Sequence, residues 1–188
     1  FCREGAKPGD QIFVTGNLGD SAMGLKILRG KIKKSGSIKH KNTLVKKHLE
    51  PIPRVKESSL LARSKLKITS MIDISDGLTQ DLGHLSTENN LGANLYEDRL
   101  PASKALLNVC FQKKYNPIDW ILQGGEDYEL LFTIKPEDVK KLEKLFLKAN
   151  VFVSHIGEIT KSPKKIILIK GNGSKVPLRV ATGFNHFK

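Results

Sequence analysis

The sequence predicts an α+β fold, a mixed β-sheet with helices packed on one face. Segments typical of strands and of amphipathic helices alternate irregularly along the 188 residues, and the last predicted strands follow one another without a helix between them. The apolar content of 39% is enough for an ample core. We see no internal repeat, and the irregular order argues against a regular doubly wound sheet.

The first half of the chain begins with a strand, a glycine-rich turn and a helix. QIFVTG has the apolar run of a short strand, and GDSAMGLKILRG has the spacing of a helix that stops at Gly30. A flexible basic connection is expected around SGS, and the PIP segment excludes a continuous helix. A short helix and a strand follow. These features are predicted at residues 11–16, 19–30, 35–37, 51–53, 58–65 and 67–74.

The second half alternates helices and strands before it ends in strands alone. Apolar residues from Ile74 to Leu85 recur at helical spacing, and Gly92 marks the predicted end of that helix. Pro101 is expected in the first turn of the next helix, where its missing N–H costs nothing. KPEDVKKLEKLFLKAN is the clearest amphipathic helix in the chain. Helices are predicted at 101–112 and 135–150, strands at 92–98, 128–134, 151–159, 164–170 and 174–180, and a hairpin turn at 171–173.

The net charge of +13 is concentrated in one segment. Residues 26–67 contain 14 Lys or Arg against two acids, whereas the rest of the chain is nearly neutral. The segment contains no Phe, Tyr or Trp, so the stacking platforms that bind single-stranded bases are missing there. A solvated, lysine-rich helix and loop is the expected structure, although the segment could attract phosphates without reading sequence.

Composition excludes several classes of protein. No window reaches the ~18 unbroken apolar residues of a membrane span, and the chain does not open with the pattern of a secretory signal. We therefore expect a cytoplasmic setting and no membrane partner. Cys2 and Cys110 lack metal-ligand spacing, so neither a zinc site nor a disulfide framework is implied. The patterns of a phosphate-binding P-loop, a calcium loop, a zinc deaminase and a nucleophile elbow are all missing.

Two clusters combine acids with glycine. In DISDG, Asp73 and Asp76 lie three residues apart where a strand gives way to a helix, and Ser75 lies between them. Such carboxylates suit magnesium shared with substrate phosphates, and the free N–H groups of the first helical turn could help to bind an anion. The alternative is that Asp76 or Ser75 simply caps the helix, which explains one acid but not both. In GGEDYE, the glycines allow a close backbone approach, although an ordinary hairpin or bulge turn fits equally well.

Together these segments resemble a known family. The matching segments are, in order, REGAKPGDQIFVTGNLGDSAMGL, HLEPIPRV, MIDISDGLTQDLGHL, GGEDYELLFT and GFNHF. They are similar to the C-terminal half of bacterial thiamine-monophosphate kinase, which belongs to the superfamily of aminoimidazole ribonucleotide synthetase. Matches run from Arg3 to Phe187 and are looser in the basic segment and between residues 97 and 120. The resemblance implies the C-terminal domain of the aminoimidazole ribonucleotide synthetase-like fold.

The resemblance also implies an activity and a set of site residues. The activity is ATP-dependent phosphorylation of thiamine monophosphate to thiamine diphosphate, with Mg²⁺ as cofactor. Asp73 and Asp76 match magnesium ligands, and Arg3 and Ser75 match ATP-contacting positions. Glu126 and Phe184 match positions that contact the thiamine moiety; some members have Tyr at the latter, so phenylalanine keeps the ring face and lacks the hydroxyl. A phosphate oxygen is already anionic, so no general base is required.

The family's N-terminal half is absent from this chain. It carries a Gly-Asp-Asp metal motif and most of the homodimer interface. Residues 1–10 are therefore expected to be a remnant of the interdomain linker, and residues 11–188 the C-terminal domain. We expect the chain to have no kinase activity without the missing N-terminal ATP- and magnesium-binding domain.

Two other functions remain open from the sequence. The first is a kinase or synthetase of the same superfamily that acts on another small phosphate or carboxylate. The second is a basic nucleic-acid-binding or scaffold-binding module that uses residues 26–67, but it leaves both acidic glycine clusters unexplained.

Overall fold

The chain forms a seven-stranded mixed sheet, seen in a computed structural model that describes residues 1–32 and 41–180. The strand order is β2-β4-β1-β5-β3-β6-β7, and all neighbours pair antiparallel except β3 and β6. This arrangement confirms the α+β class and the mixed sheet. The strands are β1 (Gln11–Thr15), β2 (Ile68–Asp73), β3 (Gly92–Tyr96), β4 (Leu130–Ile134), β5 (Val153–Thr160), β6 (Ile166–Ile169) and β7 (Lys175–Leu178).

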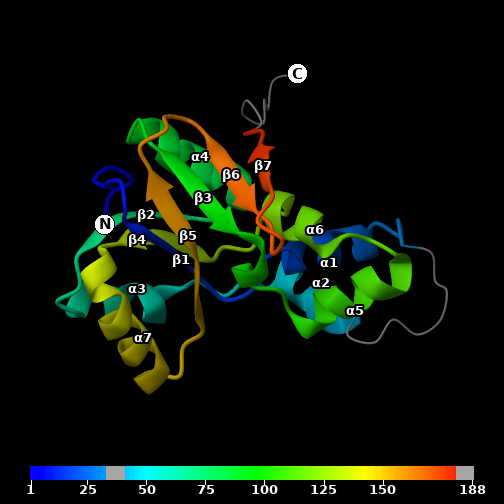
Figure 1. The fold of residues 1–188 in the computed structure, drawn as a ribbon. Helices are drawn as coiled ribbons and strands as arrows, with labels where there is room; N and C mark the ends of the chain where they lie inside the picture. Colours follow the sequence, from blue (N-terminus) through cyan, green and yellow to red (C-terminus); the bar gives the residue numbers. More distant parts are fainter. Residues whose placement is uncertain (33–40, 181–188) are drawn as a thin grey trace, which may run out of the picture.

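The helices cover both faces of this sheet rather than one. Figure 1 shows α3 and α7 together on one side of the sheet, α4 on the other, and α1, α2, α5 and α6 gathered beside it. Within the described residues, the helices are α1 (Asp20–Leu28), α2 (Lys41–Leu49), α3 (Val55–Arg63), α4 (Leu78–Glu88), α5 (Lys104–Lys113), α6 (Pro117–Gln123) and α7 (Val139–Lys148), with 3₁₀ turns at Glu97–Arg99 and Pro136–Asp138.

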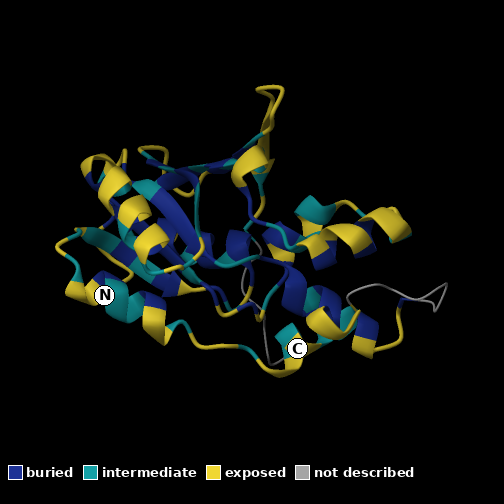
Figure 2. Ribbon diagram, turned by 90° about the horizontal axis from the view of Figure 1, so that it is seen from below, coloured by how far each residue is buried: buried dark blue, intermediate teal, exposed yellow. Residues whose placement is uncertain are grey.

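The prediction of helices on one face needs correction because β1 and β4 are apolar on both faces. Ile12 and Leu131 belong to the larger buried cluster, which includes residues of α1 and α4. Phe13 and Phe132 point to the other side and pack with residues of α3 and α7. Strand residues that alternate between two apolar faces require a cover on each face. Figure 2 shows the result, with buried strands between helices whose outer faces are exposed.

Two predicted helix boundaries were also wrong. The chain leaves α4 through Asn89 and Asn90, where Asn90 has a φ of 52°, and Gly92 instead opens β3. α5 begins at Lys104 rather than at Pro101, because the side chain of Ser103 accepts a hydrogen bond from the Leu106 N–H and caps the helix.

The predicted hairpin turn and the predicted break at PIP hold within the part of the chain that is described, whereas the helix predicted at 58–65 spans Val55–Arg63. The turn at 170–174 joins β6 to β7 as a hairpin, and PIP separates α2 from α3. The connection predicted at 35–37 lies outside the described residues. Among residues 1–32 and 41–180, no helix combines the length and apolarity needed to cross a membrane.

Candidate functional site

The two acidic glycine loops lie side by side. The DISDG loop follows β2 and the GGEDYE loop precedes β4, and these strands are antiparallel neighbours. Beyond the strand ends, the backbone of Ile74 bonds to Glu129 (2.8 Å) and Tyr128 (2.9 Å), and the Glu126 N–H donates to the Ser75 carbonyl at 2.7 Å. Segments about 50 residues apart in the sequence therefore form one continuous edge.

Glycine is required where the two loops touch. A Cβ atom on Gly125 would lie 2.7 Å from the Ser75 carbonyl oxygen, and one on Gly77 would lie 3.0 Å from the Gln123 carbonyl. Glu126 and Tyr128 have φ angles of 63° and 51°, which side-chain-bearing residues rarely adopt. Backbone strain of this kind clusters at functional sites, because only an over-determined environment sustains it.

Asp81 of α4 holds the loop that precedes this helix, and neither Asp76 nor Ser75 caps it, since the N-cap residue is Gly77 and no side chain makes a cap hydrogen bond. One oxygen of the buried Asp81 carboxylate accepts hydrogen bonds from the N–H groups of Ser75, Asp76 and Gly77 at 3.0, 3.0 and 3.1 Å. The capping alternative is therefore wrong for Asp76 and Ser75. The first turn of α4 begins at Leu78, and its N–H groups are not among those that Asp81 accepts, so the proposal that they help to bind an anion stays a prediction.

The exposed acids of the first loop do not hold the loop as Asp81 does. Asp73 and Asp76 are both exposed. Potential metal-ligand atoms of Asp76, Asp81 and His84 lie within 4.8 Å of one another, a group that does not include Asp73. Burial raises the pKa of Asp81, and the nearby Asp76 charge contributes in the same direction. The carboxylate oxygens of Asp76 and Asp81 suit a hard cation such as magnesium, which would relieve that repulsion, whereas the His84 nitrogen is a donor that magnesium does not favour.

The second loop also contains one acid that serves only the fold. Asp127 is 1% exposed, and its carboxylate accepts the N–H groups of Gly19 (2.6 Å) and Ser21 (3.1 Å) at the start of α1. Burial raises the pKa of Asp127 to about 7, although both hydrogen bonds act to lower it. Asp127 therefore caps α1 from a distant loop.

Glu129 is fully buried and pairs with two cations of the basic segment. Its Oε1 accepts from Arg54 and, at 2.8 Å, from Lys47, while Thr15 donates to Oε2 at 2.8 Å. Gly16 passes so close that a Cβ atom there would lie 2.2 Å from Oε1. The expectation of a solvated basic segment therefore needs correction at Lys47 and Arg54, which anchor α2 and the following loop to β4.

The third acid of this loop, Glu126, is half exposed and contacts α2. Its Oε2 lies 3.2 Å from Nδ1 of His48, whose ring also lies within 3.0 Å of the Ser21 hydroxyl. Sequence reasoning assigned no role to His48, Lys47 or Arg54. The only signal in the sequence was that these residues lie in or beside the HLEPIPRV segment. Their pairing with the acidic loop depends on tertiary packing.

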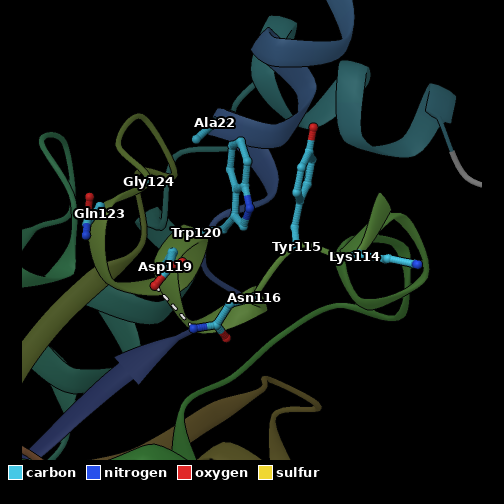
Figure 3. Close-up of a pocket in the computed structure, with 8 residues that line it drawn as sticks. All are labelled: Ala22, Lys114, Tyr115, Asn116, Asp119, Trp120, Gln123 and Gly124. Carbon is cyan, nitrogen blue, oxygen red and sulfur yellow. Dashed lines mark hydrogen bonds between the residues drawn. The ribbon is translucent and has the colours of Figure 1, made fainter. Parts of the chain in front are cut away.

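A hollow of about 480 Å³ lies beside the second loop. Figure 3 shows the rings of Tyr115 and Trp120 side by side at this hollow, with Ala22 beyond Trp120 and an Asn116–Asp119 hydrogen bond at its edge. The Lys26 ammonium group lies 4.4 and 4.7 Å from the two ring centroids. None of the described site residues predicted from sequence lines this hollow.

One of the described site residues predicted from the sequence is not brought to the two loops. Arg3 lies at the C-terminal end of α4, where its guanidinium is 3.4 Å from Glu88. Ser75 precedes the N-terminal end of this 11-residue helix, which is about 16 Å long. Phe184 lies outside the described residues. The roles of Arg3 and Phe184 stay predictions.

Comparison with known families identifies one model that covers most of the chain. Residues 7–170 match the family described as AIR synthase related protein, C-terminal domain. A relative, thiamine-monophosphate kinase of Buchnera aphidicola subsp. Schizaphis graminum (strain Sg), is 42% identical over 185 residues, covering 98% of this chain and 55% of the relative. The chain spans about half the length of the curated relatives it matches.

Solved structures agree with this comparison. The crystal structure of thiamine-monophosphate kinase from Stenotrophomonas maltophilia K279a superimposes with a TM-score of 0.77 at 31% identity, covering 89% of this chain and 52% of that one. A structure named AaThiL complexed with AMPPCP and TMP gives a TM-score of 0.74 at 30% identity, covering 93% and 51%.

Proposed function

The chain belongs to the AIR synthase related protein family as its C-terminal domain, and from this premise we propose that it is the C-terminal half of a thiamine-monophosphate kinase. The whole enzyme would transfer the γ-phosphoryl group of ATP to thiamine monophosphate, giving thiamine diphosphate and ADP. The relatives named above carry this kinase name, and one solved relative holds AMPPCP, an ATP analogue, together with TMP.

One observation in this chain carries the proposal. The DISDG and GGEDYE loops are joined through their backbones, and three acids, Asp73, Asp76 and Glu126, remain on this edge without a role in capping a helix. The acids that stabilise the fold are different residues, since Asp81 holds the loop before α4 and Asp127 caps α1. The stability of the fold therefore does not explain why three further carboxylates lie at this edge.

We propose that Asp73 and Asp76 hold Mg²⁺. When bound, the metal would neutralise phosphate charge and hold the phosphates for in-line transfer. Both backbone groups of Ser75 are used within the protein, so its contact to ATP would come from the hydroxyl group. The acceptor oxygen of a phosphate monoester is already anionic, which is why no side chain of this chain has to remove a proton.

The remaining site residues are assigned by motif. Glu126 would face the cationic thiamine moiety, Phe184 would contribute a ring face, and Arg3 would contact nucleotide phosphates. Because Arg3 lies at the far end of α4, this role requires that the bound nucleotide extend along the helix or that another part of the enzyme approach it. The N-terminal domain, a homodimeric assembly and a cytoplasmic location complete the proposal.

A direct assay tests this function. The full-length protein, incubated with ATP, Mg²⁺ and thiamine monophosphate, should produce thiamine diphosphate and ADP, whereas the 188-residue chain alone should produce neither. Other small phosphates and carboxylates serve as competing acceptors. Turnover with one of those and not with thiamine monophosphate would replace the proposed acceptor, and ADP formation by the chain alone would show that the missing domain is dispensable.

A further inference from the structure

We propose that His48 is a positioning residue that holds the Glu126 carboxylate toward the acceptor. This inference rests on the proposed function, in which Glu126 contacts the thiamine moiety. His48 lies on α2 and Glu126 in the GGEDYE loop, 78 residues later in the chain, and their Nδ1 and Oε2 atoms are 3.2 Å apart. The His48 side chain is 14% exposed and that of Glu126 is 54% exposed, so the pair lies at the rim of the site with the acid facing outward.

Close packing of two helices fixes the position of His48. A Cβ atom on Gly24 of α1 would lie 2.2 Å from the Leu44 carbonyl oxygen and 3.2 Å from the His48 Cβ. Only glycine lets α2 approach α1 this closely. The Ser21 hydroxyl, also on α1, lies 3.0 Å from the same ring nitrogen and fixes the orientation of the imidazole.

The neighbouring residue fixes α2 against the same loop. Lys47 pairs with the fully buried Glu129 at 2.8 Å, while His48 contacts Glu126 three residues earlier in the loop. Consecutive residues of one helix therefore contact two acids of one loop. Glu129 anchors the loop in the core, and His48 acts on the acid that remains exposed.

Hydrogen-bond chemistry defines the state of the ring. An ionised carboxylate can only accept, so a bond between His48 and Glu126 requires a proton on Nδ1, and the Ser21 hydroxyl oxygen, 3.0 Å from the same nitrogen, is then a second acceptor of that N–H. The backbone of Glu126 is already fixed in a left-handed conformation with a φ of 63°. Without His48, the exposed Glu126 side chain would sample several rotamers, and acceptor binding would have to restrict them.

The test uses the full-length kinase with variants at one position. His48→Leu removes the donor, whereas His48→Asn keeps an amide donor near the place of Nδ1. Lys46→Ala removes an exposed cation from the same helix and serves as the control. We expect His48→Leu to raise the KM for thiamine monophosphate about tenfold with the KM for ATP unchanged, and His48→Asn and Lys46→Ala to stay within about twofold of wild type.

Several results would overturn the inference. The first is an unchanged KM for thiamine monophosphate in His48→Leu, and the second is an equal rise in the KM for ATP. The third is a KM for thiamine monophosphate in His48→Asn that is as high as in His48→Leu. If His48→Leu does not fold, His48→Ala, which also lacks a donor, takes its place. In the isolated chain, an imidazole ¹⁵N–¹H spectrum that shows His48 protonated only at Nε2 would also overturn it. A wild-type enzyme that does not phosphorylate thiamine monophosphate would overturn the proposed function itself, whereas an active wild type with a fully active His48→Leu variant would overturn this role alone.

Discussion

Replacing Asp127 with Asn should remove part of the pH dependence of folding. Burial raises the pKa of Asp127 from 3.8 to about 7. Between these two values the folded chain keeps a proton that the unfolded chain has lost. The contribution to stability is therefore fully present below pH 3.8 and is lost as the pH rises through 7. A pKa difference of one between the folded and unfolded states corresponds to about 1.36 kcal/mol, so this group alone should lower the free energy of unfolding by about 2 kcal/mol between about pH 5 and pH 7.

Urea unfolding of the chain at about pH 5, 6 and 7 measures this effect. The amide of the Asp127→Asn variant cannot titrate, and its carbonyl can still accept one of the two N–H bonds at the start of α1. The difference between wild type and Asp127→Asn should therefore change by about 2 kcal/mol across this range. Asp98→Asn, at an exposed acid, should show the same change in the free energy of unfolding with pH as wild type. If the free energy of unfolding changes with pH equally in wild type and in Asp127→Asn, Asp127 does not link folding to protonation in this range.

The other predictions separate structural acids from site acids. Asp81→Ala removes the acceptor for three backbone N–H groups and should lower the free energy of unfolding by about 2 kcal/mol, whereas Asp76→Asn, at an exposed position, should change it by less than about 0.5 kcal/mol. Urea unfolding checks both, and a larger effect of Asp76→Asn would restore its role as a cap. Glu129→Leu leaves Lys47 and Arg54 without their buried partner and should lower the free energy of unfolding by about 3 to 5 kcal/mol. A melting temperature equal to that of wild type would contradict this.

The order of the elements could be predicted because its signals are local. The repeat of apolar residues in α7, the glycines near the turns and the proline-bounded break after α2 each act within a few residues. The faces of the sheet could not be assigned in the same way. Phe13 alternates with Ile12 and Val14, but a five-residue strand does not reveal that helices cover both of its sides.

The residues of the candidate site came from the motif resemblance, and their roles stay predictions. The motif resemblance selected Asp73, Asp76 and Glu126, and the structure places their loops together. Which acids stabilise the fold could not be read from the sequence. Asp81, inside α4, holds the loop that precedes this helix, and Asp127 caps a helix more than 100 residues away. Such contacts depend on how distant segments pack, and no local spacing encodes them.

The exposed acids of DISDG should serve phosphoryl transfer rather than folding. The most direct measurement is Mg²⁺-dependent formation of thiamine diphosphate by the full-length enzyme carrying Asp76→Asn. We predict that kcat/KM falls by about 100-fold or more at an Mg²⁺ concentration that saturates wild type, with folding retained. Wild-type turnover by a folded Asp76→Asn enzyme at that Mg²⁺ concentration would contradict this assignment.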